Sequence, residues 1–383
     1  MPATYGFLST YPPTQCGLAT FNAALATHLN ALGGSGVVRL LADDKAGGGL
    51  PLDRQAPQVM HTWRTGALGG WVAATNALNR FDVAILQHEY GIYPGDAGAE
   101  VLPLLRGLKV PSIVVLHTVL SNPDPLQRAV LEKMAARANA VVTMTDTARH
   151  RLTAGYHVDP RKVTVIPHGA ASHSSAPRDH RERPHLLTWG LLGPGKGIEW
   201  ALRALALLQD RHPAPTYTVA GRTHPNVLAK DGDVYRGSLQ ALAAELGVAD
   251  SVTWDDVYHD QATLSRLIRS ADVVLLPYDS TEQVTSGVLI EAVGADVPVV
   301  ATEFPHAVEL LADGPGLLVP HQNPEAMAAA IGHLITQPHV AGLSGLTGGP
   351  TLRWPAVAAR YAALAARLLA DRSRVPNAAK LPA

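Results

Sequence analysis

Residues 186–209 read LLTWGLLGPGKGIEWALRALALLQ, and this stretch decides the fold. The run LLTW at 186–189 is dense in large apolar residues and predicts a buried strand. The glycines that follow predict a tight turn, and the apolar spacing from Ile198 to Gln209 predicts a helix. A strand, a turn and a helix in this order are the repeating unit of a parallel sheet.

Short apolar runs of the same kind recur along the whole chain and alternate with segments of helical periodicity. In 17–32, for example, Leu18, Phe21, Leu25, Leu29 and Leu32 form one apolar stripe. The runs are too continuously apolar for half-exposed antiparallel strands, so we expect a doubly wound α/β protein. The predicted strands are 36–41, 83–86, 112–116, 140–144 and 163–166, then 186–189, 217–220, 251–254, 273–276 and 297–301.

The runs fall into two series, which predicts two Rossmann-like domains facing each other across a cleft. We expect the first domain at 1–170, a polar linker at 171–184 and the second domain at 185–345. A last amphipathic segment, with Trp354 near its start, predicts a closing helix at about 352–372 that completes the first domain.

Composition excludes several classes of protein. The 383 residues include 31 Lys and Arg against 32 Asp and Glu, so a nucleic-acid-binding role is not expected. Cys16 is the one cysteine, which excludes an internal disulfide framework and a Cys-based zinc site. The chain shows no secretory leader and no long apolar run, so we expect a cytoplasmic protein whose membrane association is at most peripheral.

The glycine-rich turn is the first candidate binding site. Gly195 and its neighbouring glycines let backbone amides approach a ligand, and the helix start favours an anion. Lys196 adds a positive charge suited to phosphate. No Ser or Thr follows the lysine, so a Walker-type nucleotide hydrolase is disfavoured. The alternative is a plain strand-to-helix turn with a solvated lysine.

A second candidate follows the predicted strand 273–276. Ser286, or the Thr before it, is a natural N-cap for a helix that would contain Glu291. A carboxylate inside such a helix needs a partner, and a vicinal diol such as ribose would supply one. The alternative partner is a basic side chain nearby.

Three histidines end predicted strands of the first domain, where ligands of such sheets bind. His117 is the strongest candidate, followed by His88 and His168. Gly17, near the start of the first helix, could let an anion or a sugar hydroxyl reach free backbone amides. Alternatively, Gly17 binds no ligand and only forms part of a packed turn in which Cys16 is a small buried residue.

Taken together, these features resemble the retaining glycosyltransferases of family 4, which have the GT-B fold. The resemblance covers nearly the whole chain. Its most specific parts are SGVLIEA at 286–292 and VPVVAT at 297–302. The resemblance implies transfer of a sugar from a UDP- or GDP-linked nucleotide sugar to a carbohydrate acceptor, with retention of configuration and without a metal.

The resemblance also implies roles for individual residues. Glu291 would hold the donor ribose, and Lys196 would neutralise the diphosphate beside Gly195. The amides of Ser286, Gly287 and Val288 would bind the diphosphate at a helix start. His117 would contact the donor sugar, and Gly17 would lie beside the diphosphate and the acceptor. The leaving phosphate would take the acceptor proton, so no general-base side chain is required.

Two residues depart from the family pattern. The paired acids of the family would place a glutamate at position 283, where this chain has Gln283, which can bind sugar hydroxyls but carries no charge. Leu191 stands where the family tends to have an arginine. We expect Arg222, after another strand, to replace that cation.

The reading that the sequence favours is a hexosyltransferase of class EC 2.4.1. Two alternatives remain open. One is a GT-B sugar-nucleotide epimerase, which would need no acceptor pocket. The other is a catalytically silent accessory or binding protein, for which the loss of charge at Leu191 and Gln283 would be the sign.

Overall fold

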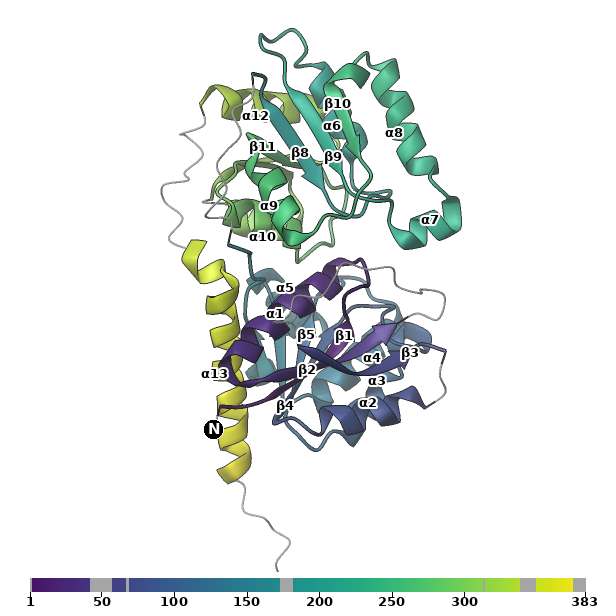
Figure 1. Cartoon of the computed structure of the whole chain (residues 1–383), viewed down its shortest axis with the longest axis vertical. Helices are drawn as coiled ribbons and strands as arrows, with labels where there is room; N and C mark the ends of the chain where they lie inside the picture. Colours follow the sequence, from purple (N-terminus) through teal and green to yellow (C-terminus); the bar gives the residue numbers. More distant parts are fainter. Residues whose placement is uncertain are drawn as a thin grey trace, which may run out of the picture. The chain divides into compact units, whose positions relative to one another are not determined.

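The computed structural model describes residues 2–41, 57–66, 69–172, 182–312, 314–337 and 349–374. The chain divides into two compact units. Unit 1 contains Met1–His168 together with Trp354–Ala383, and unit 2 contains Gly169–Arg353. Most of the linker expected at 171–184 lies outside the described residues. Each unit is built around its own parallel sheet (Figure 1).

Unit 1 contains a seven-stranded sheet in the order β3-β2-β1-β4-β5-β6-β7, and every pair of neighbours is parallel. The chain moves outward from β1 in one direction and then returns to continue in the other, which is the Rossmann arrangement. The strands are β1 (Tyr5–Thr10), β2 (Ser35–Leu41), β3 (Gln58–Arg64), β4 (Val83–His88), β5 (Ser112–Leu116), β6 (Ala140–Thr143) and β7 (Val163–Val165).

Helices cover this sheet and include one from the far end of the sequence. They are α1 (Gly17–Gly33), α2 (Gly70–Leu78), α3 (Val101–Gly107), α4 (Pro125–Arg137), α5 (Asp146–Gly155) and α13 (Trp354–Arg374), with short 3-10 turns at Asp96–Gly98 and Pro160–Lys162. Trp354, Val357 and Tyr361 of α13 share one core with Phe21 of α1. The amphipathic pattern of the last segment therefore correctly predicts a helix that completes the unit 1 core.

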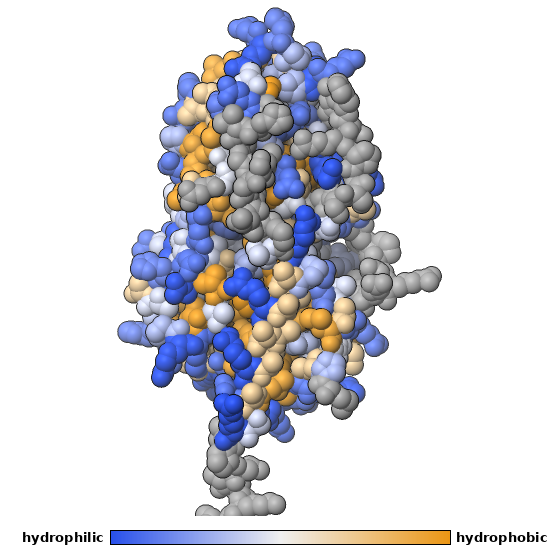
Figure 2. Space-filling model, turned by 90° about the vertical axis from the view of Figure 1, so that its left-hand side faces the viewer, coloured by the Kyte–Doolittle hydropathy of each residue, from blue (hydrophilic) through white to orange (hydrophobic). Residues whose placement is uncertain are grey.

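The outer side of α13 is composed mainly of alanine and arginine. Ala359, Ala363 and Ala366 are exposed there, together with Arg360 and Arg367. Figure 2 views the molecule from the side on which α13 lies and shows pale and blue residues next to each other along it. Among the described residues, no helix is both long enough and apolar enough to cross a membrane.

Unit 2 contains a six-stranded parallel sheet in the order β10-β9-β8-β11-β12-β13. If the strands of each unit are numbered from its own first strand, both sheets have the order 3-2-1-4-5-6, and unit 1 adds a seventh strand at the end. The strands are β8 (His185–Trp189), β9 (Thr216–Ala220), β10 (Val252–Asp255), β11 (Val273–Leu276), β12 (Val299–Thr302) and β13 (Gly316–Val319).

Seven α-helices of unit 2 lie in the described part of the chain. They are α6 (Ile198–Ala206), α7 (Pro225–Asp231), α8 (Val234–Glu245), α9 (Gln261–Arg269), α10 (Gly287–Gly294), α11 (Pro305–Leu311) and α12 (Pro324–Thr336), with 3-10 turns at Ala249–Ser251 and Gly349–Leu352. Two apolar clusters, one that contains Leu186 and Val273 and another that contains Leu187 and Val274, place helices on both faces of the sheet.

The predicted strands are all present, with small differences at their ends. β12 begins at Val299 and not at residue 297, because Pro298 has no N–H to donate to a neighbouring strand. The predicted set did not include β1, a central strand, or β3 and β13, which lie at sheet edges. Leu32, expected on the apolar stripe of the first helix, is 48% exposed at the end of α1.

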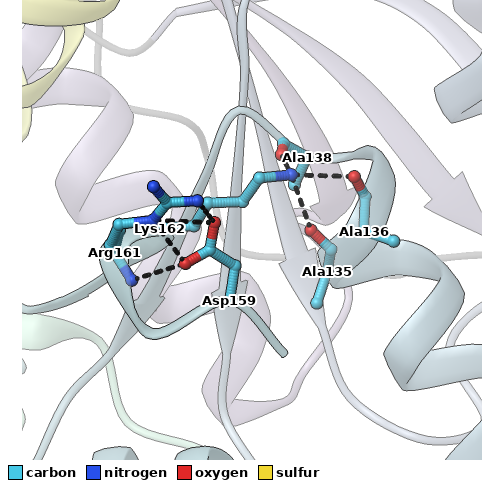
Figure 3. Close-up of polar contacts among 6 residues, drawn as sticks. All are labelled: Ala135, Ala136, Ala138, Asp159, Arg161 and Lys162. Carbon is cyan, nitrogen blue, oxygen red and sulfur yellow. Dashed lines mark hydrogen bonds and ion pairs between the residues drawn. The ribbon is translucent and has the colours of Figure 1, made fainter. Parts of the chain in front are cut away.

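Lys162 binds the end of α4 in unit 1. Its Nζ donates to the carbonyl oxygens of Ala136 at 2.8 Å and Ala138 at 2.9 Å, and more weakly to that of Ala135 at 3.4 Å (Figure 3). The last carbonyls of a helix have no partner within the helix and carry partial negative charge, so a cation there is stabilising. The neighbouring Arg161 forms an ion pair with Asp159 and is 89% exposed.

We expect Lys162→Met to lower the free energy of unfolding by about 1 kcal/mol, because three carbonyls lose a charged donor. The matched control, Arg161→Met, removes an exposed ion pair and should have little effect. Urea unfolding followed by circular dichroism measures both. Equal stability of the two variants would show that Lys162 does not stabilise the end of α4.

Candidate active site

The glycine-rich turn of unit 2 connects β8 to α6 through backbone that favours glycine. Gly190, Gly195 and Gly197 have φ angles of 122°, 85° and 64°. At Gly197 a Cβ would lie 1.7 Å from the carbonyl oxygen of Pro277, so any side chain is excluded. Asp279 N–H donates to Gly195 O at 3.0 Å, which fixes the turn to the loop that follows β11.

Lys196 lies within this turn and is half-buried. Its Nζ lies 4.4 Å from the centre of the Tyr278 ring, and burial lowers the pKa of Lys196 to about 8. No ion pair of Lys196 exists among the residues that the structure describes. A half-buried ammonium group supported by an aromatic face, without a carboxylate partner, is suited to an anionic ligand.

Lys196 lines a groove of about 340 Å³ at the carboxyl end of the unit 2 sheet. The other lining residues are Leu191, Gly193, Pro194, His224, Asn226 and Val227. Leu191, the departure from the family arginine, therefore faces the groove with an apolar side chain. Arg222 is exposed on the loop after β9 and is not among the lining residues. Its contact with a phosphate stays a prediction.

Sequence reasoning missed the two polar residues that line the groove opposite the glycines. His224 Nδ1 accepts a hydrogen bond from Asn226 N–H at 3.1 Å and caps α7. Both residues follow β9, and their position after a parallel strand was the available signal. Tyr278, two residues after the end of β11, was also missed, because a cation–π contact leaves no spacing pattern in a sequence.

The start of α10 is fixed by two side chains. Ser286 is the N-cap, with its Oγ accepting from Leu289 N–H at 3.2 Å, and its own N–H donates to Nδ1 of the buried His306 at 2.7 Å. Gly287 and Val288 form the first turn, whose amides have no acceptor within the helix. A Cβ on Gly190 would lie 3.8 Å from Val288, so the helix start lies next to the glycine-rich turn.

Glu291 lies one turn further along α10 and is half-buried. Both of its carboxylate oxygens accept from Ala171 N–H, at 3.3 and 3.2 Å, and Arg353 donates to Ala171 O at 3.4 Å. Gln283 instead turns toward its own loop, where its amide donates to Thr285 O at 3.2 Å. Lys196, Gly195 and the α10 start are thus brought together, while Gln283 is bound to the loop before that helix.

His117 directly follows β5 in unit 1 and is surrounded by buried groups. Its Nε2 lies 2.9 Å from Gln87 Oε1, and the Phe21 ring meets the imidazole edge-on at 4.8 Å. Burial, followed by the nearby His168 and His88, lowers the pKa of His117 to about 3. The ring is therefore neutral at physiological pH.

The other strand-end residues of unit 1 lie around His117. His168 also meets Phe21 edge-on, at 4.9 Å, and burial lowers the pKa of His88 to about 4. Glu89 accepts hydrogen bonds from the Thr118 hydroxyl and from Tyr90 N–H, and burial raises its pKa. The sequence missed Glu89 and Gln87, although both lie at the end of a predicted strand.

Gly17 is the first residue of α1, next to its N-cap Cys16. A Cβ on Gly17 would meet none of the described atoms within 4 Å, so with respect to the described residues the space above this helix start is open. The Cys16 thiol accepts from Ala19 N–H at 3.4 Å and is half-buried. Among the described residues, no three His, Cys, Asp or Glu side chains are grouped so as to hold a metal ion.

Comparison with known proteins places the chain in a family. Residues 16–172 match the family described as Glycosyltransferase Family 4, and residues 183–337 match the family described as Glycosyl transferases group 1. Together the two matches cover most of both units.

Named relatives and solved structures agree with these matches. A D-inositol 3-phosphate glycosyltransferase of Segniliparus rotundus is 30% identical over 278 residues, which is 66% of this chain and 60% of that protein. A second, from Stackebrandtia nassauensis, is 33% identical over 58% of this chain and 52% of its own length. The chain thus spans little more than half of these relatives.

Among solved structures, sucrose-phosphate synthase from Thermosynechococcus elongatus has a TM-score of 0.76 at 18% identity and covers 96% of this chain and 100% of its own. Anabaena HepE in complex with UDP and glucose has a TM-score of 0.70 at 15% identity, covering 97% and 99%. At these identities the likeness concerns the fold, which is the two-Rossmann GT-B fold. The chain belongs to the family 4 glycosyltransferases.

Proposed function

We propose that this protein transfers a hexosyl group from a nucleotide sugar to a carbohydrate acceptor, with retention of configuration and without a metal. The observation that carries the proposal is Lys196, a half-buried cation that lies on the Tyr278 ring and lines the unit 2 groove. Such a cation, next to glycine amides and a helix start, is suited to a diphosphate.

In this proposal unit 2 binds the donor. Lys196, the turn at Gly195 and the first amides of α10, from Ser286 to Val288, bind the diphosphate. Glu291 accepts hydrogen bonds from the ribose hydroxyls, for which an acceptor-only carboxylate is suited. The solved complexes of Anabaena HepE with UDP and with UDP-glucose support a UDP-linked donor; GDP is the alternative.

Unit 1 contributes His117, which would contact a hydroxyl of the donor sugar. The open space above Gly17 supports a place for the acceptor or the diphosphate there. The names of the relatives support a sugar, a cyclitol or one of their phosphates as acceptor.

The proposed reaction breaks the bond between the anomeric carbon and the diphosphate oxygen. The acceptor oxygen forms its bond to the anomeric carbon on the same face, and its proton passes to the departing phosphate. Negative charge grows on the diphosphate during this step, so Lys196 and the α10 amides stabilise the transition state more than the ground state. Gln283, bound to its own loop, would contribute a hydrogen bond to the sugar and no charge.

A panel of UDP-, GDP- and ADP-sugars, each with and without sugar and cyclitol-phosphate acceptors, tests the function. We expect nucleoside diphosphate release that depends on the acceptor, with a product that has the anomeric configuration of the donor. Epimerised donor without acceptor would support an epimerase. Tight nucleotide binding without turnover would support a silent binding protein, in line with Leu191 in the groove.

Substitutions test the donor site. Lys196→Met and Glu291→Ala should each lower kcat/KM for the donor at least about tenfold, or about 1.4 kcal/mol, because each removes a charged contact. Arg222→Ala should weaken nucleoside diphosphate binding by only about threefold, because the exposed side chain is screened by solvent. Initial rates and calorimetry measure these changes.

Matched controls are Lys230→Met and Glu245→Gln, exposed residues of α7 and α8. Both should leave the kinetics unchanged. Circular dichroism checks the fold of Glu291→Ala, since Glu291 also accepts from Ala171 N–H. Wild-type kinetics in a folded Lys196 or Glu291 variant would exclude that residue from the donor site, and wild-type nucleotide affinity in Arg222→Ala would exclude Arg222.

The lowered pKa of Lys196 predicts a pH dependence of donor binding. The group is charged below its pKa of about 8 and neutral above it, and a diphosphate binds the charged form. Nucleoside diphosphate affinity should therefore fall about tenfold between pH 7 and pH 9. Lys196→Arg, which stays charged, should bind with the same affinity at both pH values. An equal fall in the two proteins would show that another group titrates.

A further inference from the structure

A row of three polar side chains leads from the interior of unit 1 to His117. Asn22 lies on α1 and Gln87 on β4, and both are completely buried. Gln87 Nε2 donates to Asn22 Oδ1 at 3.3 Å, and Gln87 Oε1 lies 2.9 Å from His117 Nε2. Buried polar groups are costly unless they are hydrogen-bonded, so this row needs an explanation beyond packing.

The row fixes which nitrogen of His117 carries the hydrogen. The amide nitrogen of Gln87 is directed to Asn22, so its oxygen faces the imidazole. A carbonyl oxygen has no hydrogen to donate, and His117 Nε2 must therefore donate to it. In the neutral ring the other nitrogen, Nδ1, then carries a lone pair and can only accept.

The surroundings keep the ring neutral and fixed. Among the described residues, the ionisable groups that act on its charge are His88 on β4 and His168 after β7. Glu89 is bound to Thr118, the residue that follows His117. α1 contributes the apolar Phe21, which meets the imidazole edge-on. Burial and the two histidines all disfavour a positive charge on His117. The Glu89 carboxyl group accepts hydrogen bonds from the Thr118 hydroxyl and from Tyr90 N–H. His117 N–H also donates to His88 O at 3.0 Å, which fixes the backbone.

We propose that Asn22 and Gln87 are positioning residues that hold His117 as the neutral Nε2–H tautomer, so that its Nδ1 accepts a hydrogen bond from a hydroxyl of the donor sugar. The inference rests on the proposed function. A neutral acceptor is favourable there, because positive charge grows at the anomeric carbon as the diphosphate leaves, and an imidazolium would oppose it.

The tautomer can be measured without any substrate. In full-length protein labelled with ¹⁵N-histidine, the resonances of His117 are assigned by their loss in His117→Asn. We expect Nε2 to carry the hydrogen in the wild type and Nδ1 to have the shift of a bare nitrogen. A hydrogen on Nδ1 in the wild type overturns the proposal, whether or not the protein is an enzyme.

Gln87→Glu keeps the shape of the side chain and places a carboxylate beside His117. Asn22 can rotate to donate to the carboxylate, since its Nδ2 has no partner in the described part of the chain. The carboxylate should raise the pKa of His117, so the acidic limb of kcat/KM for the donor should move upward by at least one pH unit. The matched control is Gln58→Glu, an exposed glutamine at the start of β3, which should leave the profile unchanged.

Gln87→Leu removes the acceptor for Nε2–H. We expect a mixture of tautomers at His117 and a fall of at least about tenfold in kcat/KM for the donor. Asn22→Ala, which leaves Gln87 free to rotate its amide, should give a smaller change of the same kind. A single Nε2–H tautomer and wild-type kinetics in folded Gln87→Leu would overturn the proposal. If the wild type turns over no donor, the proposed transferase function is wrong. The tautomer measurement still tests whether Asn22 and Gln87 hold His117 in the Nε2–H form.

Discussion

The donor half of the site depends on one close approach of backbone to backbone. Gly197 lies so near the carbonyl of Pro277 that a Cβ would be 1.7 Å from its oxygen. This approach places the turn after β8 against the end of β11, where Asp279 N–H binds Gly195 O. Because of it, the Tyr278 ring lies beside Lys196 and supports a cation that has no described carboxylate partner. A wider turn would separate the charge from the aromatic face.

The two sheets have the same order of strands and present their candidate residues at the same edge, but the chemistry differs. Unit 2 offers a cation, glycine amides and a helix start, which suit a diphosphate. Unit 1 offers a neutral imidazole within a buried polar row, which suits a sugar hydroxyl. The arrangement follows from parallel topology, since the carboxyl ends of all strands lie at one edge.

Much of the fold was predictable from the sequence because its buried strands are short, continuously apolar and separated by amphipathic helices. β3 and β13 were not, because edge strands have an exposed side and a weaker pattern. The central β1 was not in the predicted set either, because Gly6, Ser9 and Thr10 interrupt its apolar run. Lys196 was recognisable from the glycines around it. Its contact with Tyr278, and the row from Asn22 to His117, join residues far apart in sequence, and no local pattern encodes them.

α13 follows unit 2 in the sequence, yet it belongs to the core of unit 1. The chain leaves unit 2 where it entered, since Ala170 N–H donates to Leu352 O and Ala170 pairs with Arg353. A ribosome therefore releases all of unit 2 before Trp354 and Tyr361 can cover Phe21. Unit 1 is therefore completed only after unit 2 has been synthesised, and its apolar surface needs protection until α13 has been added.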